Sequence, residues 1–341
     1  MTVIKSRIGL LALALVLIAS LTACGSKSSG SIVEGKINVV TTFYPIYEFA
    51  KEIGGEDINV INLLPVGVEP HDWTPRSQDI MNTSKAQLFL YNGAGLEGWV
   101  PNFLKGLDSS SKVKAVEVSK GIDLIMTNEE HDHDHGVEEE HDHDHEHEDE
   151  HDHSGNTNES SNASEDSLYT DPHTWVSPKS AIVMARNIKE SLESVDPEHK
   201  DGYEERYNKL AERLEALDNK FEEELTKLPN HKIVVSHQAF SYLARDYGLE
   251  QYAIMGLSPD AEPRGQDIVN LAKMVKEEGI KYIFFEELVS DKLAKTLAGE
   301  AGVSTMVLNP VEGLTAEQEK NGDNYFTLME KNLQNLIMAL Q

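Results

Sequence analysis

Short apolar runs rich in β-branched residues alternate with amphipathic stretches along most of this chain. In the first half, strands are predicted by the runs INVVTTF, INVINLL, AQLFLYNG and VKAVEV, with helical patterns at 47–53 and in LEGWVPNFLKGL. In the second half, KIVVS, QYAIMG, KYIFF and STMVLN predict strands, and helices are expected from Ala239, Gln266 and Asp291 and at the end of the chain. Such alternation is typical of parallel sheets covered on both faces, so we expect two Rossmann-like α/β lobes.

A long amphipathic helix is expected between the two series. Asp196 and Pro197 suit its N-cap and first helical position. About 30 helical residues would span roughly 45 Å at about 1.5 Å per residue, which favours a rigid helix that joins the lobes. Its apolar stripe recurs every three or four residues and consists of Tyr203, Tyr207, Leu210, Leu214, Leu217, Phe221 and Leu225.

The N-terminus has the pattern of an export signal. Lys5 and Arg7 precede an apolar run that is too short for a stable membrane-spanning helix. The run ends in LTAC, which resembles the bacterial lipobox, so Cys24 is expected to carry the lipid, with GSKSSGS after it as a flexible tether. Because Cys24 is the chain's only cysteine, no internal disulfide is expected.

These patterns predict the following organisation. We expect a lipoprotein signal peptide at 1–24, a tether at 25–35, an N-terminal lobe at 36–196 that includes a disordered loop at 127–167, a linking helix at 197–228 and a C-terminal lobe at 229–341.

Composition excludes two broad classes of function. The 341 residues carry a net charge of −29, from 30 Lys and Arg against 59 Asp and Glu, which argues against nucleic-acid binding. The hydrophobic fraction of 39% argues against a polytopic membrane protein.

Most of the 14 histidines lie in one acidic tract. Its segment His147-Glu148-Asp149-Glu150-His151 matches the zinc-protease pattern, but that pattern needs an apolar helix face, which the tract lacks. Imidazoles on a mobile chain favour weak, multiple and exchangeable zinc ions, so we interpret the tract as a zinc collector. Its histidines are His131, His133, His135, His141, His143, His145, His147, His151 and His153.

Three isolated histidines have similar surroundings elsewhere. His71 lies in EPHDW after a predicted strand, His173 lies in DPHTW before a helix, and His237 follows the strand KIVVS. In open parallel sheets, ligands bind beyond the carboxyl ends of the strands. Three imidazoles and one carboxylate form a natural tetrahedral zinc set, whereas His199 and His231 are interpreted as surface residues.

Several segments together resemble the metal-specific substrate-binding lipoproteins of bacterial ABC transporters, especially the zinc-uptake (ZnuA/AdcA-like) branch. The resemblance covers nearly the whole chain and rests on the lipobox, the acidic His-rich insertion and the segments VVTTFYPIYEFAKEIGG, GVEPHDWTP, DPHTWVSP, VSHQAFSYLARDYGL and LNPVEGLT.

The resemblance implies a metal site in the cleft between the lobes, with His71, His173 and His237 as ligands and Glu312 as the fourth. It also implies Zn²⁺ as cargo, with Mn²⁺ less favoured because manganese-binding relatives have a carboxylate where this chain has His237. Glu69, Glu286 and Glu287 remain further candidates that could point into the cleft.

The implied function is zinc capture and delivery to an ABC permease that is driven by a cytoplasmic ATPase. The protein would be a monomer anchored by lipid to the outer face of the cytoplasmic membrane, in a bacterium that the pattern indicates is Gram-positive. Four protein ligands leave no open position for catalytic water, so we expect no enzyme. The alternatives are a surface adhesin or extracellular zinc store, and a zinc-dependent hydrolase.

Overall fold

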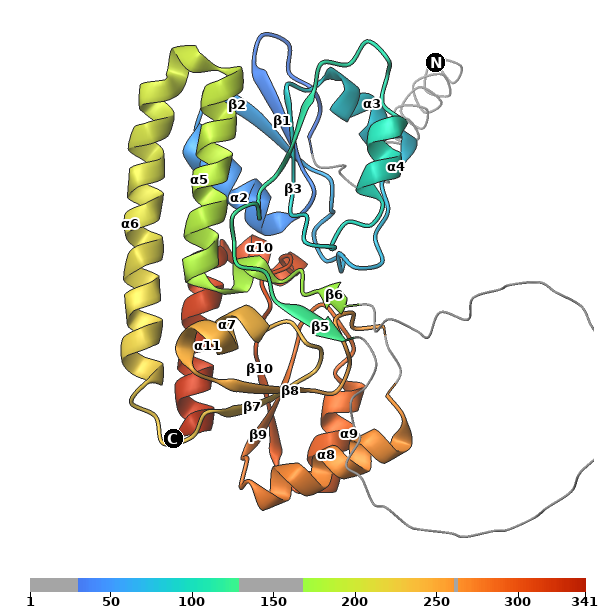
Figure 1. Cartoon of the computed structure of the whole chain (residues 1–341), viewed down its shortest axis with the longest axis vertical. Helices are drawn as coiled ribbons and strands as arrows, with labels where there is room; N and C mark the ends of the chain where they lie inside the picture. Colours follow the sequence, from blue (N-terminus) through green and yellow to red (C-terminus); the bar gives the residue numbers. More distant parts are fainter. Residues whose placement is uncertain (1–29, 129–167, 261–262) are drawn as a thin grey trace, which may run out of the picture.

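The computed structural model describes residues 30–128, 168–260 and 263–341 (Figure 1). The expected signal peptide with Cys24 and the nine histidines of the acidic tract lie outside these described residues. Within the described part, no helix is both long and apolar enough to cross a membrane.

Two α/β lobes are present, each built on a four-stranded sheet of parallel strands (Figure 1). The N-terminal sheet has the order β2-β1-β3-β4, and the C-terminal sheet has the order β10-β9-β7-β8. The central strands bury consecutive residues because helices cover both faces, which explains their continuous apolar runs. The strands are β1 (Ile37–Thr41), β2 (Ile58–Asn62), β3 (Leu88–Tyr91), β4 (Lys114–Glu117), β7 (Lys232–Val235), β8 (Glu250–Ala253), β9 (Tyr282–Phe285) and β10 (Ser304–Val307).

Helices connect the strands in both lobes, as the sequence predicts. Two helices were not predicted, α3 and the six-residue α10. Helix α3 is polar along most of its length and buries only Thr83, so its sequence gives little periodic signal. The helices of the lobes are α2 (Tyr44–Gly54), α3 (Ser77–Lys85), α4 (Val100–Lys105), α7 (Ser241–Tyr247), α8 (Gly265–Glu277), α9 (Lys292–Ala301), α10 (Ala316–Asn321) and α11 (Tyr325–Leu340).

Two long helices, α5 (Pro178–Val195) and α6 (Lys200–Leu225), run side by side, and the longer α6 continues past α5 along both lobes (Figure 1). The predicted linking helix is α6, but it begins at Lys200, since Pro197–His199 form a separate 3₁₀ turn. Near one end, the Arg206 side chain donates to Ile53 O at 2.6 Å, and further along Tyr247 Oη of α7 donates to Asp218 at 2.8 Å. Helix α6 is therefore fastened to both lobes.

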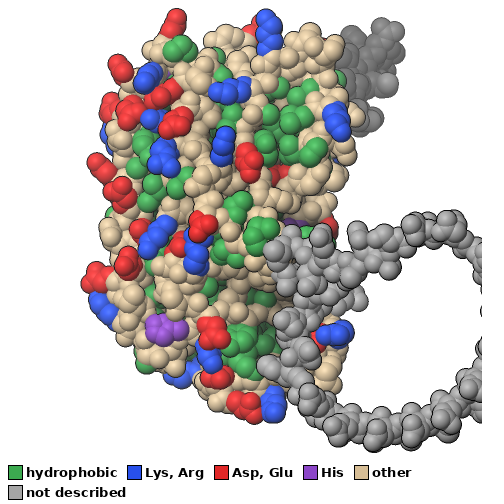
Figure 2. All heavy atoms as spheres, viewed as in Figure 1, with side chains coloured by type: hydrophobic (Ala, Val, Ile, Leu, Met, Phe, Trp, Pro, Cys, Tyr) green, Lys and Arg blue, Asp and Glu red, His purple; other side chains and the backbone are tan. Residues whose placement is uncertain are grey.

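The face formed by α6 carries charges of both signs, interspersed along the helix (Figure 2). Pairs one turn apart, such as Glu205 with Lys209 and Glu223 with Lys227, account for part of this pattern. On this face no basic stripe is visible.

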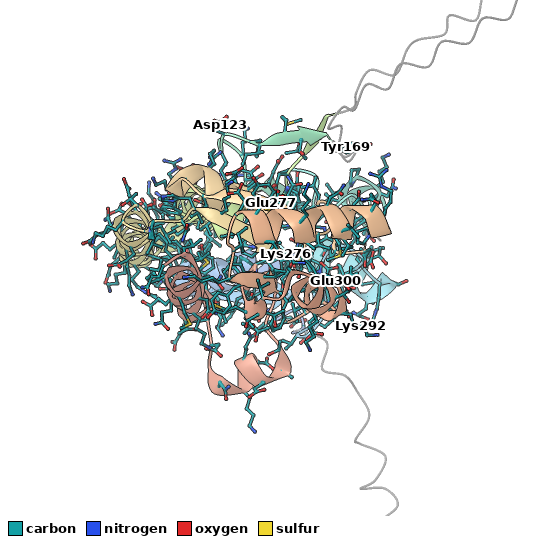
Figure 3. All side chains as sticks on the ribbon, turned by 90° about the horizontal axis from the view of Figure 1, so that it is seen from below. Asp123, Tyr169, Lys276, Glu277, Lys292 and Glu300 are labelled. Atoms are coloured by element: carbon teal, nitrogen blue, oxygen red, sulfur yellow. The ribbon has the colours of Figure 1, made fainter. Side chains whose placement is uncertain are left out.

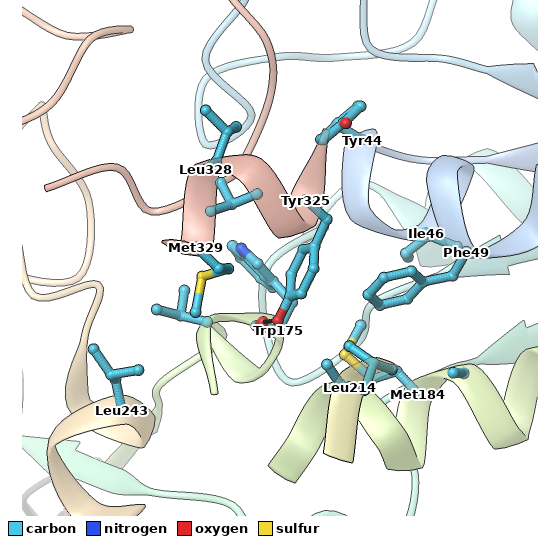
Figure 4. Close-up of a cluster of buried hydrophobic side chains, with 14 of the residues drawn as sticks. Tyr44, Ile46, Phe49, Trp175, Met184, Leu214, Leu243, Tyr325, Leu328 and Met329 are labelled. Atoms are coloured by element: carbon cyan, nitrogen blue, oxygen red, sulfur yellow. Dashed lines mark hydrogen bonds between the residues drawn. The ribbon is translucent and has the colours of Figure 1, made fainter. Parts of the chain in front are cut away.

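Large aromatic side chains join the lobes beside the helix pair (Figure 4). Phe49 of α2 packs edge-on against Tyr325 of α11, with ring centroids 5.0 Å apart. Tyr325 Oη then donates to Trp175 O at 2.8 Å, and Trp175 Nε1 donates to Pro310 O at 2.7 Å. All three aromatic side chains are fully buried, so one continuous core supports both lobes.

A short antiparallel ribbon, β5 (Met126–Asn128) with β6 (Leu168–Thr170), was not predicted. Thr127 and Asn128, assigned to the disordered loop from the sequence, belong to β5 instead. Three-residue strands give no readable alternation, and this ribbon depends on contacts made around it. Asp171 N donates to Ile125 O at 2.9 Å where the ribbon ends. Asp123 and Tyr169 mark the ribbon at the margin of the molecule (Figure 3).

Candidate metal centre

The structure brings together four side chains that are far apart in the sequence. His71 follows β2, His173 precedes the 3₁₀ turn Thr174–Val176, His237 follows β7, and Glu312 follows β10. Three of the four therefore lie beyond the carboxyl ends of parallel strands, and the cluster lies where the two sheets face each other.

Five of the six distances between the ligand atoms of the cluster are close to the edges of a tetrahedral site, and all the atoms lie within 4.8 Å of one another. His173 Nε2 lies 3.1 Å from His71 Nε2 and 3.2 Å from His237 Nε2. Glu312 Oε1 lies 3.5 Å from His71 Nε2, 3.5 Å from His173 Nε2 and 3.6 Å from His237 Nε2. A tetrahedral zinc ion with bonds of about 2.0–2.1 Å separates its ligands by about 3.3 Å, so the cluster fits such an ion closely.

Water has almost no access to these atoms. His173 and His237 are fully buried, Glu312 is 1% exposed, and the His71 side chain is 11% exposed. Glu312 Oε1 makes no hydrogen bond, because the three Nε2 atoms around it are too distant or poorly directed. A buried carboxylate oxygen without a donor is costly, so its position among three ring nitrogens favours an added cation.

Two further carboxylates orient the buried rings. Asp171 Oδ1 lies 2.9 Å from His173 Nδ1, and Glu286 Oε1 lies 2.8 Å from His237 Nδ1. Each carboxylate holds the proton on Nδ1, which leaves Nε2 free to bind a metal. Asp171 is a functional residue that the sequence analysis missed, although it stands two residues before His173 in DPHTW.

Opposing effects set the charge of the metal-free cluster. Burial alone would lower the pKa of His173 and His237, but Asp171 and Glu286 respectively raise the pKa of these rings above the ordinary value. Burial would likewise raise the pKa of Glu312, yet the surrounding imidazoles hold that pKa well below its usual range. Protons thus compensate the carboxylates in the metal-free state, and a bound cation must displace them.

The other candidate carboxylates have different partners. Glu286 supports His237 through Nδ1 and lies outside the four-residue cluster. Glu287 points elsewhere: its Oε2 accepts from Asn309 Nδ2 at 2.7 Å and from Gln318 Nε2 at 2.6 Å. Glu69 Oε1 accepts the backbone N–H of His71 at 3.0 Å, which stabilises the loop, and burial raises the pKa of Glu69 to about 7.

The two remaining histidines are not part of the cluster. The His199 side chain is 48% exposed and bonds Asp196, as expected for a surface residue. His231 is only partly exposed, and its Nδ1 is buried without a hydrogen-bond partner.

The His173 segment is held from both lobes. Asn92 Nδ2, after β3, donates to Pro172 O at 2.8 Å. From the C-terminal lobe, Tyr242 Oη donates to Asp171 O at 2.8 Å and accepts from Ile125 N at 3.1 Å. Position and ring orientation of His173 are therefore fixed independently of any metal.

Comparison with known proteins gives a consistent result. The family model described as ZnuA, zinc-uptake complex component A, periplasmic, matches residues 39–339. The zinc-binding lipoprotein AdcA of Streptococcus pneumoniae serotype 4 is 40% identical over 318 residues, covering 93% of this chain and 58% of AdcA. The high-affinity zinc uptake system protein ZnuA of Bacillus subtilis is 39% identical over 314 residues, covering 91% of each chain.

Solved structures agree with the sequence relatives. The Zn(II)-bound ZnuA-like domain of S. pneumoniae AdcA superposes with a TM-score of 0.71 at 38% identity, covering 90% of this chain and 99% of that domain.

Fold and site together define a two-lobed α/β protein with a buried His₃Glu cluster between its lobes. The chain belongs to the ZnuA family, which confirms the resemblance seen in the sequence. It spans little more than half the length of the AdcA proteins that it matches.

Proposed function

We propose that this protein captures one zinc ion between its lobes and delivers it to the permease of an ABC transporter. The observation that carries the proposal is the buried His₃Glu cluster, whose ligand atoms already have the separations that a tetrahedral zinc ion requires. The names of its AdcA and ZnuA relatives support zinc as the cargo.

In this proposal His71, His173, His237 and Glu312 are the ligands, while Asp171 and Glu286 orient two of the rings. Three imidazoles with one carboxylate suit Zn²⁺ better than Mn²⁺, which prefers oxygen donors. Four protein ligands complete the tetrahedron, so no position is left for the water that a zinc hydrolase activates. Reversible capture is the chemistry that this arrangement serves best.

The same proposal includes the parts of the chain outside the described residues. Lipid on Cys24 would hold the protein at the outer face of the cytoplasmic membrane, beside the permease and above its ATPase. The histidines of 131–153 would act as a weak zinc collector. The lipoprotein names of the streptococcal relatives support the anchor. Streptococcal laminin-binding proteins are also structurally similar at 27–29% identity, but the AdcA and ZnuA relatives at 39–40% identity favour transport over the adhesin alternative.

A competitive zinc titration of the form beginning at residue 25 tests the proposal. We expect one tight site that survives deletion of 129–167, a deletion that keeps both strands of the ribbon, and that is lost in His237→Ala. Loss of the tight site with the tract, or its persistence in His237→Ala, would overturn the assignment. Delivery is tested separately, by growth of the gene-deletion strain in zinc-poor medium, where unchanged growth would contradict transport.

A further inference from the structure

Val311, immediately before Glu312, has a backbone conformation that its residue type disfavours. Its φ angle is +58°, in the left-handed region, and its side chain is fully buried. A β-branched residue seldom adopts this region, and such strain persists only where the surroundings impose it. Because the backbone of Val311 sets the direction in which Glu312 leaves the chain, the strain bears directly on the fourth corner of the cluster.

Two side chains hold the peptide between Pro310 and Val311: Asn309 bonds its N–H, and Trp175 Nε1 donates to its carbonyl oxygen, Pro310 O. Asn309 Oδ1 accepts the backbone N–H of Val311 at 2.7 Å, a short-range bond that closes the turn from 309 to 311. Both groups are buried, so breaking the bond would leave an amide hydrogen without a partner. With the chain on both sides held in place, Val311 can leave the left-handed region only if the peptide between Pro310 and Val311 flips, and that flip would break this bond.

Asn309 is itself fixed at each of its other polar groups. Its backbone N–H donates to Asn332 Oδ1 at 2.8 Å, and its backbone oxygen accepts from Asn332 Nδ2 at 2.6 Å. Its own Nδ2 donates to Glu287 Oε2, which also accepts from Gln318. Asn309 cannot rotate without breaking several buried bonds, which makes it a rigid support for the turn.

We propose that Asn309, clamped by Asn332 on α11 and by Glu287, is a positioning residue for metal capture. It holds Val311 in the left-handed conformation and so aims the Glu312 carboxylate at the three imidazoles before zinc arrives. The inference rests on the proposed function, and it also gives Glu287 a role other than that of a ligand.

A double-mutant cycle tests this role, with zinc affinity measured by chelator competition. Asn309→Ala should lose about 10- to 100-fold in affinity, the range found for residues that support metal ligands. Glycine adopts positive φ without strain, so in a Val311→Gly background the same change should cost less than about fivefold. If Asn309 had only a general structural role, Asn309→Ala would lower zinc affinity equally with valine and with glycine at position 311.

Asn38→Ala is the matched control, because Asn38 is also a buried asparagine that bonds backbone oxygens, at Val33 and Lys36, but it lies at the other end of β1 from the cluster. It should lose stability and keep its zinc affinity. If Asn309→Ala does not fold, Asn309→Ser takes its place, since a hydroxyl can make the same bond more weakly.

Equal losses from the Asn309 substitution in both backgrounds, or no loss in either, would overturn the inference. Both outcomes presuppose a wild-type protein that binds zinc tightly. Absence of that tight site would instead contradict the proposed function.

Discussion

At the scale of single residues, the centre depends on carboxylates that would not touch the metal. Asp171 provides a sharp test, because asparagine has the same shape and can still accept the Nδ1–H of His173 but carries no charge. We expect Asp171→Asn to lower zinc affinity by about tenfold or more, since the charge makes the imidazole a stronger ligand. Chelator competition measures the change.

Asp57→Asn is a suitable control for that experiment. Asp57 of the N-terminal lobe pairs with Arg206 of α6, away from the cluster, so its loss should affect stability and leave zinc affinity unchanged. Affinity of Asp171→Asn within twofold of the wild type, in a folded protein, would show that orientation alone matters.

Glu48 allows a prediction about pH that is independent of the metal. Burial raises the pKa of Glu48 from 4.5 to about 7, despite the Tyr325 N–H that its carboxylate accepts. Because folding raises this pKa, the contribution of Glu48 to the free energy of unfolding is greatest below about pH 4.5 and is lost as the pH rises through about 7. Glu48→Gln stays neutral, so it should be more stable than the wild type at pH 8, by at most about 3 kcal/mol.

The measurement is urea unfolding of the metal-free protein at several pH values. The difference between Glu48→Gln and the wild type should narrow steadily towards pH 5. If the two proteins differ in stability by the same amount at pH 5 and at pH 8, ionisation of the Glu48 carboxyl is not the cause of the difference.

At the scale of elements, the sequence predicts what periodicity encodes. The central strands β1, β3, β7 and β9 bury consecutive residues, and α6 buries a regular stripe. The edge strands β4, β8 and β10 bury no residue fully, but their short runs were still readable. The β5–β6 ribbon was not, because its pairing depends on contacts from distant elements. Glu286 and Glu287 show a related limit: neighbours at the end of a strand point to opposite sides, and only the structure reveals which one faces His237.

The candidate site divides in the same way. Strand-end or Pro-His contexts singled out the three histidines, whereas Glu312 came from a family resemblance, because no periodic pattern marks its loop. Asp171 bonds the ring of His173, and Asn309 bonds Val311 beside Glu312; both contacts are visible only when the folded positions are known.

Tyr242 on α7 connects the ribbon to the metal centre, which leads to a prediction for these elements. In Tyr242→Phe, the Ile125 N–H and the Asp171 carbonyl lose their common partner. We expect a loss of about 1–3 kcal/mol in stability and faster hydrogen exchange at Ile125. Tyr252→Phe, which removes an exposed hydroxyl, is the control. Unchanged exchange at Ile125 would contradict the connection.

At the scale of the whole molecule, contacts that do not involve the metal hold the two lobes together. Helix α6 bonds both lobes, and the buried contacts of Trp175 and Tyr325 cross between them beside the centre. Wide opening about a hinge would break these buried contacts together. Release of the metal should therefore proceed by local movement of the ligand loops.

Zinc binding should thus stabilise one cooperative unit and change its overall dimensions very little. At a free zinc concentration 100 times the Kd, mass action adds about 2.7 kcal/mol to the free energy of unfolding. We expect calorimetry to show a single transition that moves to higher temperature, and small-angle scattering to give nearly equal radii of gyration with and without zinc. His237→Ala should lose the thermal shift, whereas a large contraction on binding, or separate melting of the lobes, would show that the helices and the shared core do not brace the molecule.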